Sequence, residues 1–210
     1  MSDEPLRLTL PVRSEAGAEA IRALRSGQRV LLSGTLYTAR DAAHRRMVEA
    51  LARGEELPFP PEGAAIYYAG PSPARPGRVI GAAGPTTSGR MDAYTPALLA
   101  QGVKVMIGKG SRSPEVKEAI RQHGAAYLVA TGGAAALLAR RIKAARVIAY
   151  PDLGTEAVYE LVVEDFPAIV VNDSVGGDLY SEGVQAYRRE DDRQATPGTA
   201  GFAPEPAPVH

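Results

Sequence analysis

Residues 28–54 carry the sequence QRVLLSGTLYTARDAAHRRMVEALARG. The apolar beginning, 28–32, is typical of a buried strand, and 36–38 adds a short extended piece. Asp41 then begins a helix that reaches about Arg53, because its carboxylate is favoured at the positive end of the helix dipole. This strand–loop–helix unit predicts an α/β fold and places charged residues at the start of a helix.

The rest of the chain supplies strands and helices that do not alternate strictly. Strands are expected at 6–12, 64–69, 78–83, 103–107, 127–130, 146–149, 158–163 and 168–171, and helices at 15–25, 91–101, 114–123 and 131–143. A layered α/β domain with a mixed sheet accommodates such an order. Pro, Gly and charged residues dominate 190–210, so we expect one domain over 1–189 and a disordered tail over 190–210.

The composition excludes several classes of protein. Lys plus Arg equals Asp plus Glu at 24 each, so no global field attracts the chain to nucleic acid or to an anionic membrane. The absence of Cys excludes a disulfide framework and a thiolate-held zinc or iron–sulfur site in this chain. Three scattered His predict no metal site. Without a signal peptide or a run of about 18 apolar residues, a cytoplasmic protein is expected.

The first of three cation-bearing loops is 34–44, GTLYTARDAAH. Arg40 precedes the helix start, where its guanidinium and the helix dipole can hold a carboxylate together. The alternative is that Arg40 forms a surface ion pair with Asp41 or Glu49. His44 lies one helical turn later on the same face, and it is either part of the site or an ordinary core or surface histidine.

The second loop is 84–92, GPTTSGRMD. Its three hydroxyl residues precede a helix, where Ser and Thr are preferred as caps. Capping needs only one hydroxyl, however. The surplus, with Arg90 beside it, favours an anion site made of backbone N–H groups and hydroxyls.

The third loop is 108–111, GKGS, which fails the phosphate-loop pattern because Val103 and Gly110 stand where that pattern needs Gly and a hydroxyl. Lys109 can still point into a cleft as a compact charge. Together Arg40, Arg90 and Lys109 provide three cations at the ends of three strands. One carboxylate does not need so many, so the loops predict a dicarboxylate ligand.

At these loops the sequence resembles the β subunit of class I, iron–sulfur-dependent fumarate hydratases and of the related L-tartrate dehydratases. The three motifs GTLYTARDAAH, GPTTSGRMD and IGKG (107–110) occur in order and well spaced, and the likeness extends over about 6–187. The resemblance implies a swivelling β/β/α domain. It also implies a partner α subunit, or an N-terminal domain, that holds a 4Fe–4S cluster through three cysteines, with the unique iron acting as a Lewis acid on the substrate.

Residue roles follow from the same resemblance. Arg40, Arg90 and Lys109 match family residues that bind the substrate. Thr86 matches the residue proposed to handle the proton at the carbon next to a carboxylate. A threonine hydroxyl is a weak base, so neighbouring cations and a dry site would have to lower its pKa, or Thr86 would relay or orient instead. Side chains expected to support these groups are Thr87, His44 and Asp41.

The resemblance implies reversible hydration of fumarate to L-malate by a dimer of αβ pairs. Tartrate dehydration to oxaloacetate is the alternative within this class. A different class also stays open, namely a non-catalytic dicarboxylate-binding or scaffold subunit, which would need no cluster-bearing partner.

Overall fold

The computed structural model describes residues 4–130 and 134–188, so the tail expected over 190–210 lies outside the described residues. The elements follow in chain order as β1 Leu6–Leu10, α1 Glu15–Ala23, β2 Arg29–Thr38, α2 Asp41–Ala52, β3 Ala65–Tyr67, the 3-10 helix η1 Ser88–Met91, α3 Thr95–Ala100, β4 Val105–Gly108, α4 Pro114–His123, β5 Ala126–Val129, α5 Ala135–Ala139, β6 Ile142–Ala149, the 3-10 helix η2 Pro151–Glu156, β7 Val158–Asn172 and α6 Leu179–Tyr187. In this part of the chain no helix combines the length and the apolar character needed to cross a membrane.

A mixed sheet organises these elements. Its strand order is β1-β2-β3-β4-β5-β7-β6, with β2, β3, β4 and β5 parallel to one another. Strand β7 runs antiparallel to β5 and β6 and also pairs with β2. Because β7 joins β5 to β2, the strands β2, β3, β4, β5 and β7 form a closed, barrel-like ring. The predicted α/β class with a mixed sheet is confirmed, and the swivelling motion implied by the resemblance stays a prediction.

The long strand β7 replaces two shorter strands that the sequence predicts at 158–163 and 168–171. Asp165 adopts a positive φ of 49°, and its backbone N–H donates to Ser33 Oγ at 3.0 Å. The strand therefore bends at this point without ending. Pro167 continues the pairing opposite Leu31, so the break expected between the two strands is absent.

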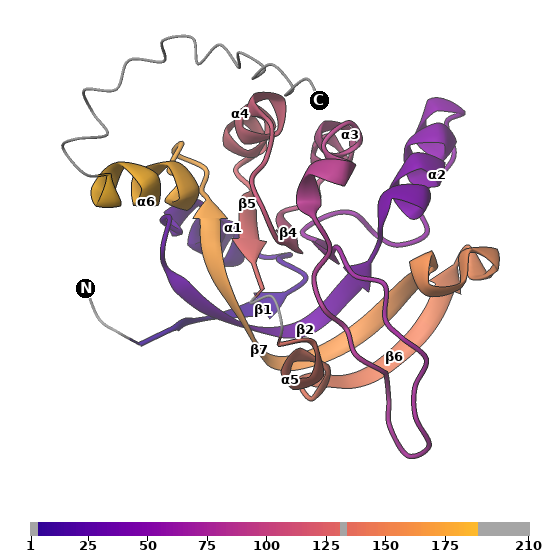
Figure 1. The fold of residues 1–210 in the computed structure, drawn as a ribbon. Coiled ribbons are helices and arrows are strands. Elements are labelled where there is room, and N and C mark those ends of the chain that lie inside the picture. The colour runs from indigo at the N-terminus through magenta and orange to yellow at the C-terminus, as the bar shows by residue number, and fades with distance from the viewer. Residues whose placement is uncertain (1–3, 131–133, 189–210) are drawn as a thin grey trace, which may run out of the picture.

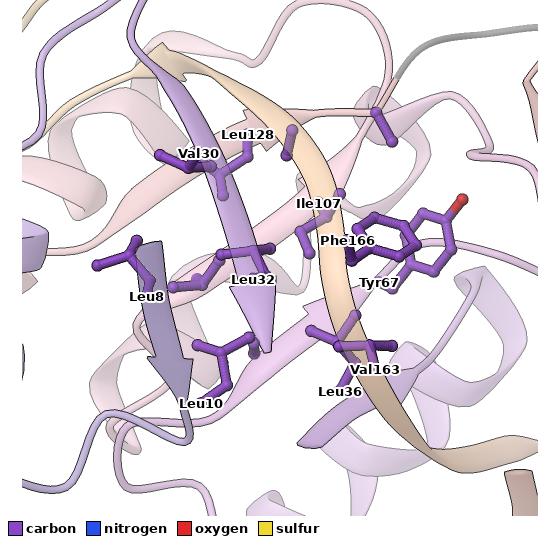
Figure 2. Packing of buried hydrophobic residues seen from close by; sticks show 14 of the residues in the cluster. Leu8, Leu10, Val30, Leu32, Leu36, Tyr67, Ile107, Leu128, Val163 and Phe166 are labelled. Carbon is purple, nitrogen blue, oxygen red and sulfur yellow. The ribbon is translucent and has the colours of Figure 1, made fainter. Parts of the chain in front are cut away.

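Apolar side chains fill the inside of the ring (Figure 2). This inner core includes Leu8, Leu10, Val30, Leu32, Leu36, Tyr67, Ile107, Leu128, Val163 and Phe166. The rings of Tyr67 and Phe166 meet edge to face with centroids 5.2 Å apart. Strand β1 approaches β2 so closely at Gly34 that a Cβ there would lie 2.0 Å from the carbonyl oxygen of Leu10.

A second core lies between the outer face of the sheet and the helices α2, α3 and α4, which stand together on one side of it (Figure 1). Its members include Met47, Ile66, Leu98, Ile120 and Tyr127. The sheet thus separates a barrel interior from a helical layer. Residues at the ends of its strands are therefore positioned by packing in the barrel interior and by packing in the helical layer.

Three further predicted elements differ from the structure. Residues 78–83 form no strand but part of the loop between β3 and η1. The helix expected at 91–101 begins as η1 and resumes as α3, where Pro96 occupies a first-turn position that needs no N–H donor. The helix expected to reach residue 143 ends at Ala139, and β6 begins at Ile142; the start expected at 131 lies outside the described residues.

Candidate active site

The carboxyl ends of β2, β3 and β4 bring the three cation-bearing loops together. Arg40 follows β2, Thr86 and Arg90 lie on the connection that leaves β3, and Lys109 follows β4. Because these strands are parallel neighbours, their carboxyl ends meet at one edge of the sheet, where α/β proteins place their ligands.

Asp41 stands between two of the cations. The Nη2 atom of Arg90 donates to Asp41 Oδ2 at 2.7 Å, and Arg40 Nε lies 3.9 Å from Asp41 Oδ1. The side chain of Arg90 is 48% exposed, whereas that of Arg40 is 23% exposed. One carboxylate at the start of α2 therefore links the loop after β2 to the loop after β3.

Glu156, at the end of η2, is a second carboxylate that the sequence reasoning missed. Its Oε1 atom lies 3.0 Å from Arg40 Nη2, and its Oε2 atom accepts the backbone N–H of Ala42 at 3.3 Å. The alternative in which Arg40 pairs with Asp41 is thus present, but Glu49 lies near Arg45 instead. Glu156 is 116 positions from Arg40, and nothing in its local sequence marks it.

These carboxylates change the charge available to a ligand. Arg40 and Arg90 each have an acidic neighbour, while no hydrogen bond or ion pair engages the Lys109 side chain within 4–130 and 134–188. Arg40 Nε and Asp41 Oδ1 are nevertheless buried without a hydrogen-bond partner among the described atoms. Buried polar atoms of this kind need a partner, so a ligand oxygen or a water molecule fits beside Arg40.

The loop that carries Thr86 is fixed by its backbone. Thr86 N–H donates to the carbonyl of Tyr68 at 2.7 Å, and its own carbonyl accepts Lys109 N–H at 3.3 Å. Ser88 N–H then donates to the carbonyl of Lys109 at 2.9 Å. Thr87 precedes η1 but makes no capping hydrogen bond with its side chain, so the capping alternative is wrong for this residue. These backbone hydrogen bonds hold the main chains of Thr86 and Lys109 next to each other.

The side chain of Ser88 also holds the loop that carries Thr86 against the loop that carries Lys109. Its Oγ atom accepts Lys109 N–H at 3.1 Å and lies 2.8 Å from the hydroxyl of Tyr127, which in turn donates to Gly110 O at 2.8 Å. A Cβ on Gly108 would lie 1.9 Å from Ser88 Oγ. Glycine at 108 is therefore required by the close approach of the two loops.

A buried ion pair joins the same loops further from the edge. Arg112 Nε donates to Asp92 Oδ1 at 2.7 Å, and Asp92 Oδ2 accepts Ser113 N–H at 2.6 Å. The Arg112 guanidinium lies 5.2 Å and 4.9 Å from the ring centroids of Tyr68 and Tyr127. The Arg112 side chain is fully buried, so the pair acts as an internal tie between the segments that carry Arg90 and Lys109.

His44 is a core histidine, as one of the two alternatives proposed. Its Nδ1 atom lies 2.8 Å from the carbonyl oxygen of Arg40, and its ring meets Tyr68 edge to face at 5.2 Å. Because a carbonyl only accepts, Nδ1 carries the hydrogen, and the buried Nε2 has no partner among the described atoms. Burial, helped by the positive charge of Arg112, lowers the pKa of His44 to about 4. A neutral His44 ring therefore holds the backbone of Arg40 through this hydrogen bond.

Comparison with known proteins shows the family of this chain. The family model described as the fumarase C-terminus matches residues 3–183. The chain belongs to the fumarase C-terminus family. All the site residues discussed above lie inside the matched range.

Relatives in the fumarase C-terminus family fall into two groups by length. Fumarate hydratase 2 of Leishmania major is 46% identical over 158 residues, and the aerobic class I fumarate hydratase of Escherichia coli K12 is 44% identical over 156 residues. These stretches cover 74% and 73% of this chain but only 28% of each relative, so the chain spans about 28% of their length.

A Methanocaldococcus jannaschii protein, provisionally named the β subunit of an L(+)-tartrate dehydratase, represents the second group. It is 39% identical over 168 residues, which cover 77% of this chain and 86% of that protein. This fumarase C-terminus domain therefore has counterparts both within long chains and as nearly the whole of a short one.

The side chains of this family member do not fit an iron–sulfur cluster. Thiolates hold such clusters, and the sequence contains no Cys. Within the described ranges, no group of three or more His, Asp or Glu side chains has the arrangement of a metal site. The strand ends present cations and a hydroxyl instead.

Proposed function

We propose that this chain is the β subunit of a two-subunit class I fumarate hydratase, which catalyses the reversible hydration of fumarate to L-malate. The observation that carries the proposal is the meeting of Arg40, Arg90, Lys109 and Thr86 at one sheet edge within the family-matched range. Fumarate and malate each have two carboxylates and no other charge. Cations on separate loops suit such a substrate, because each carboxylate can meet its own guanidinium or ammonium group.

We assign one substrate carboxylate to Arg40 and Arg90, which share Asp41, and the other to Lys109. Arg40 supports this assignment because its buried Nε atom lacks a hydrogen-bond partner among the described atoms. Thr87, His44 and Asp41 act on the substrate only through these groups. Asp41 and Glu156 keep both arginines oriented before the substrate arrives.

We assign proton handling at the carbon beside a carboxylate to Thr86. A backbone hydrogen bond joins Thr86 to Lys109, and this supports the assignment because a neighbouring positive charge favours ionisation of a hydroxyl. Exclusion of water by a second polypeptide would strengthen that effect. The second polypeptide in this proposal is a cytoplasmic α subunit that carries the 4Fe–4S cluster, and the active assembly is a dimer of αβ pairs.

L-tartrate dehydratase is the alternative within the same reaction class. One specific observation favours it: the chain covers 86% of the relative provisionally named as a tartrate dehydratase β subunit, but only 28% of the fumarate hydratases. A scaffold or simple dicarboxylate-binding subunit is a third candidate. It differs because it would bind a dicarboxylate without a partner.

Anaerobic reconstitution tests these candidates. The purified chain is mixed with the iron–sulfur α subunit from the same organism and assayed on fumarate, L-malate and both tartrate enantiomers. We expect each subunit alone to be inactive and the mixture to interconvert fumarate and malate faster than it dehydrates either tartrate. Activity of this chain without a partner would contradict the half-site proposal, and a preference for tartrate would assign the alternative substrate.

A further inference from the structure

The loop between β3 and η1 makes a lobe that leaves the candidate active site and returns to it (Figure 1, magenta, lower right). Ser72 N–H donates to Ala82 O at 3.0 Å, and this bond closes the neck of the lobe. We call residues 72–82 the arginine loop. Gly70, just before it, packs on the side chain of Arg40, and Thr86 follows four positions after its end. The lobe therefore stands at the rim of the site.

A cleft of about 580 Å³ lies between the arginine loop and helix α5. Arg75 and Arg78 from the loop and Arg140 from the end of α5 line it, together with the apolar side chains of Ile80 and Ile142. No Asp or Glu is among its lining residues. We call this feature the arginine cleft.

The three arginines of the cleft differ from several other surface arginines in having no carboxylate partner among the described residues. Arg22, Arg53 and Arg121 each form an ion pair with a neighbouring carboxylate. Within the described ranges no ion pair engages the three cleft arginines. In a chain whose formal net charge is zero, this is a local concentration of uncompensated positive charge.

Apolar side chains are exposed in the cleft, at Val79, and next to it, at Leu137. Val79 on the arginine loop is 49% exposed and Leu137 on α5 is 62% exposed. Arginine is enriched at protein–protein interfaces, and the centres of such interfaces bury apolar groups. Sites for small anions instead use buried polar groups or converging backbone N–H groups, whereas the cleft arginines extend into solvent.

We propose that the arginine cleft is the docking site for an acidic segment of the α subunit. This inference rests on the proposed function, in which a second polypeptide completes the site. Carboxylates of that segment pair with Arg75, Arg78 and Arg140, and its apolar groups cover Val79 and Leu137. The contact lies beside the loop that supplies Thr86, so it seats the α subunit over the substrate cations.

The test compares two triple variants that lose the same positive charge. The cleft variant is Arg75→Ser/Arg78→Ser/Arg140→Ser. The matched control is Arg22→Ser/Arg53→Ser/Arg121→Ser, which removes three exposed arginines that are already paired on this chain. Association of each full chain with the α subunit is measured by stopped flow and equilibrium titration at about 0.05 and 0.3 M salt, a range over which screening of exposed charges changes strongly.

We expect the cleft variant to bind the α subunit at least about tenfold more weakly at low salt and to lose most of the salt dependence of the association rate. The control should retain the wild-type Kd within about twofold, because exposed ion pairs contribute little. Equal binding of the α subunit by the cleft variant and by wild type would overturn the docking inference, while the hydratase proposal would stand.

An equal loss of affinity in the cleft variant and the control would also overturn the docking inference, since net charge alone would then explain binding. If wild type and the α subunit form no active complex, the hydratase proposal fails and the docking role falls with it.

Discussion

Thr86 has both backbone groups engaged, one with Tyr68 and the other with Lys109, so only its side chain is free to act on a ligand. We expect Thr86→Ala to lower kcat of the reconstituted enzyme by about 10²–10⁴-fold, the usual contribution of a positioned proton-transfer group, with a small change in KM. Thr86→Ser should restore part of the rate because it keeps the hydroxyl. Steady-state kinetics on fumarate and malate check this, and an effect confined to KM would assign Thr86 to binding.

Arg90 tests the assignment of cations to the substrate. Its side chain is 48% exposed and its ion pair with Asp41 contributes little to folding, so Arg90→Ala should change the free energy of unfolding by less than about 1 kcal/mol. The same variant should lower kcat/KM by about 100-fold, because it removes a charged hydrogen-bond donor from the substrate. Urea titration and kinetics on one preparation separate the two effects. If Arg90→Ala had the same kinetics as wild type, Arg90 would be a surface arginine without a role in substrate binding.

His44 links the site to acid stability. Its pKa is about 4 in the folded chain, against about 6.5 for an unperturbed histidine, so the unfolded chain binds more protons between these values. The free energy of unfolding should therefore fall as pH drops from about 6.5, by up to about 3 kcal/mol at pH 4. His44→Gln should lose this component, as urea titrations at pH 7, 5 and 4 would reveal.

His123→Gln is the matched control for that titration, since it removes a histidine but leaves His44 in place. The contribution of His44 should persist in this variant. If the free energies of unfolding of wild type and His44→Gln differed by the same amount at all three pH values, burial of His44 would not explain the loss of stability in acid.

Among single residues, those next to strand ends could be predicted from the sequence as site residues more readily than those that are distant in sequence from their partners. Arg40 and Lys109 come just after β2 and β4, so a parallel sheet must gather them at one edge. Thr86 and Arg90 lie much further along the chain from β3, and the loop after that strand brings them back to the same edge. Their catalytic and binding roles stay predictions. Glu156 and Arg112 escaped notice because their partners are set by tertiary packing and not by local pattern.

Among the elements, the connections after β3 and β4 behave as one unit because Asp92 and Arg112 tie them. We expect Asp92→Ala to cost about 3–5 kcal/mol of stability, since it leaves the fully buried Arg112 side chain without its counter-charge. Adding Arg112→Met should recover part of that loss, so the double variant should be less destabilised than the sum of the single variants. A double-mutant cycle by urea unfolding measures the coupling, and additivity would show that the pair is not a tie.

Element boundaries were predictable where a cap or a period marked them. Ser113 and Pro114 start α4 as expected, because a hydroxyl cap and a first-turn proline act locally. The arginine loop was mistaken for a strand at 78–83 because an apolar pattern carries no information about pairing. Similarly, β7 looked like two strands because the bend at Asp165 resembles a turn until its partner β2 is placed beside it.

For the whole molecule, the closed ring depends on its inner core, to which helices α1 and α5 contribute Ile21 and Leu138. Phe166 is fully buried inside it against Tyr67. We expect Phe166→Ala to lower the free energy of unfolding by about 3–5 kcal/mol through lost burial and a residual cavity. Val147→Ala on β6, where the side chain is 44% exposed, should cost less than about 1 kcal/mol. Chemical denaturation of both variants checks the contrast, and similar losses would mean that the ring interior is not the main core.

The pairing of β2 with β7 also has a consequence during synthesis of the protein. Asp165 on β7 meets Ser33 on β2 across 132 positions of sequence. At about 5–20 residues per second, a ribosome needs roughly 7–26 seconds to make the chain between them. During that interval the apolar face of β2 has no β7 to cover it, and the ring cannot close. The nascent chain is therefore a natural client for chaperones until its last long strand emerges, and late truncations should aggregate instead of folding partially.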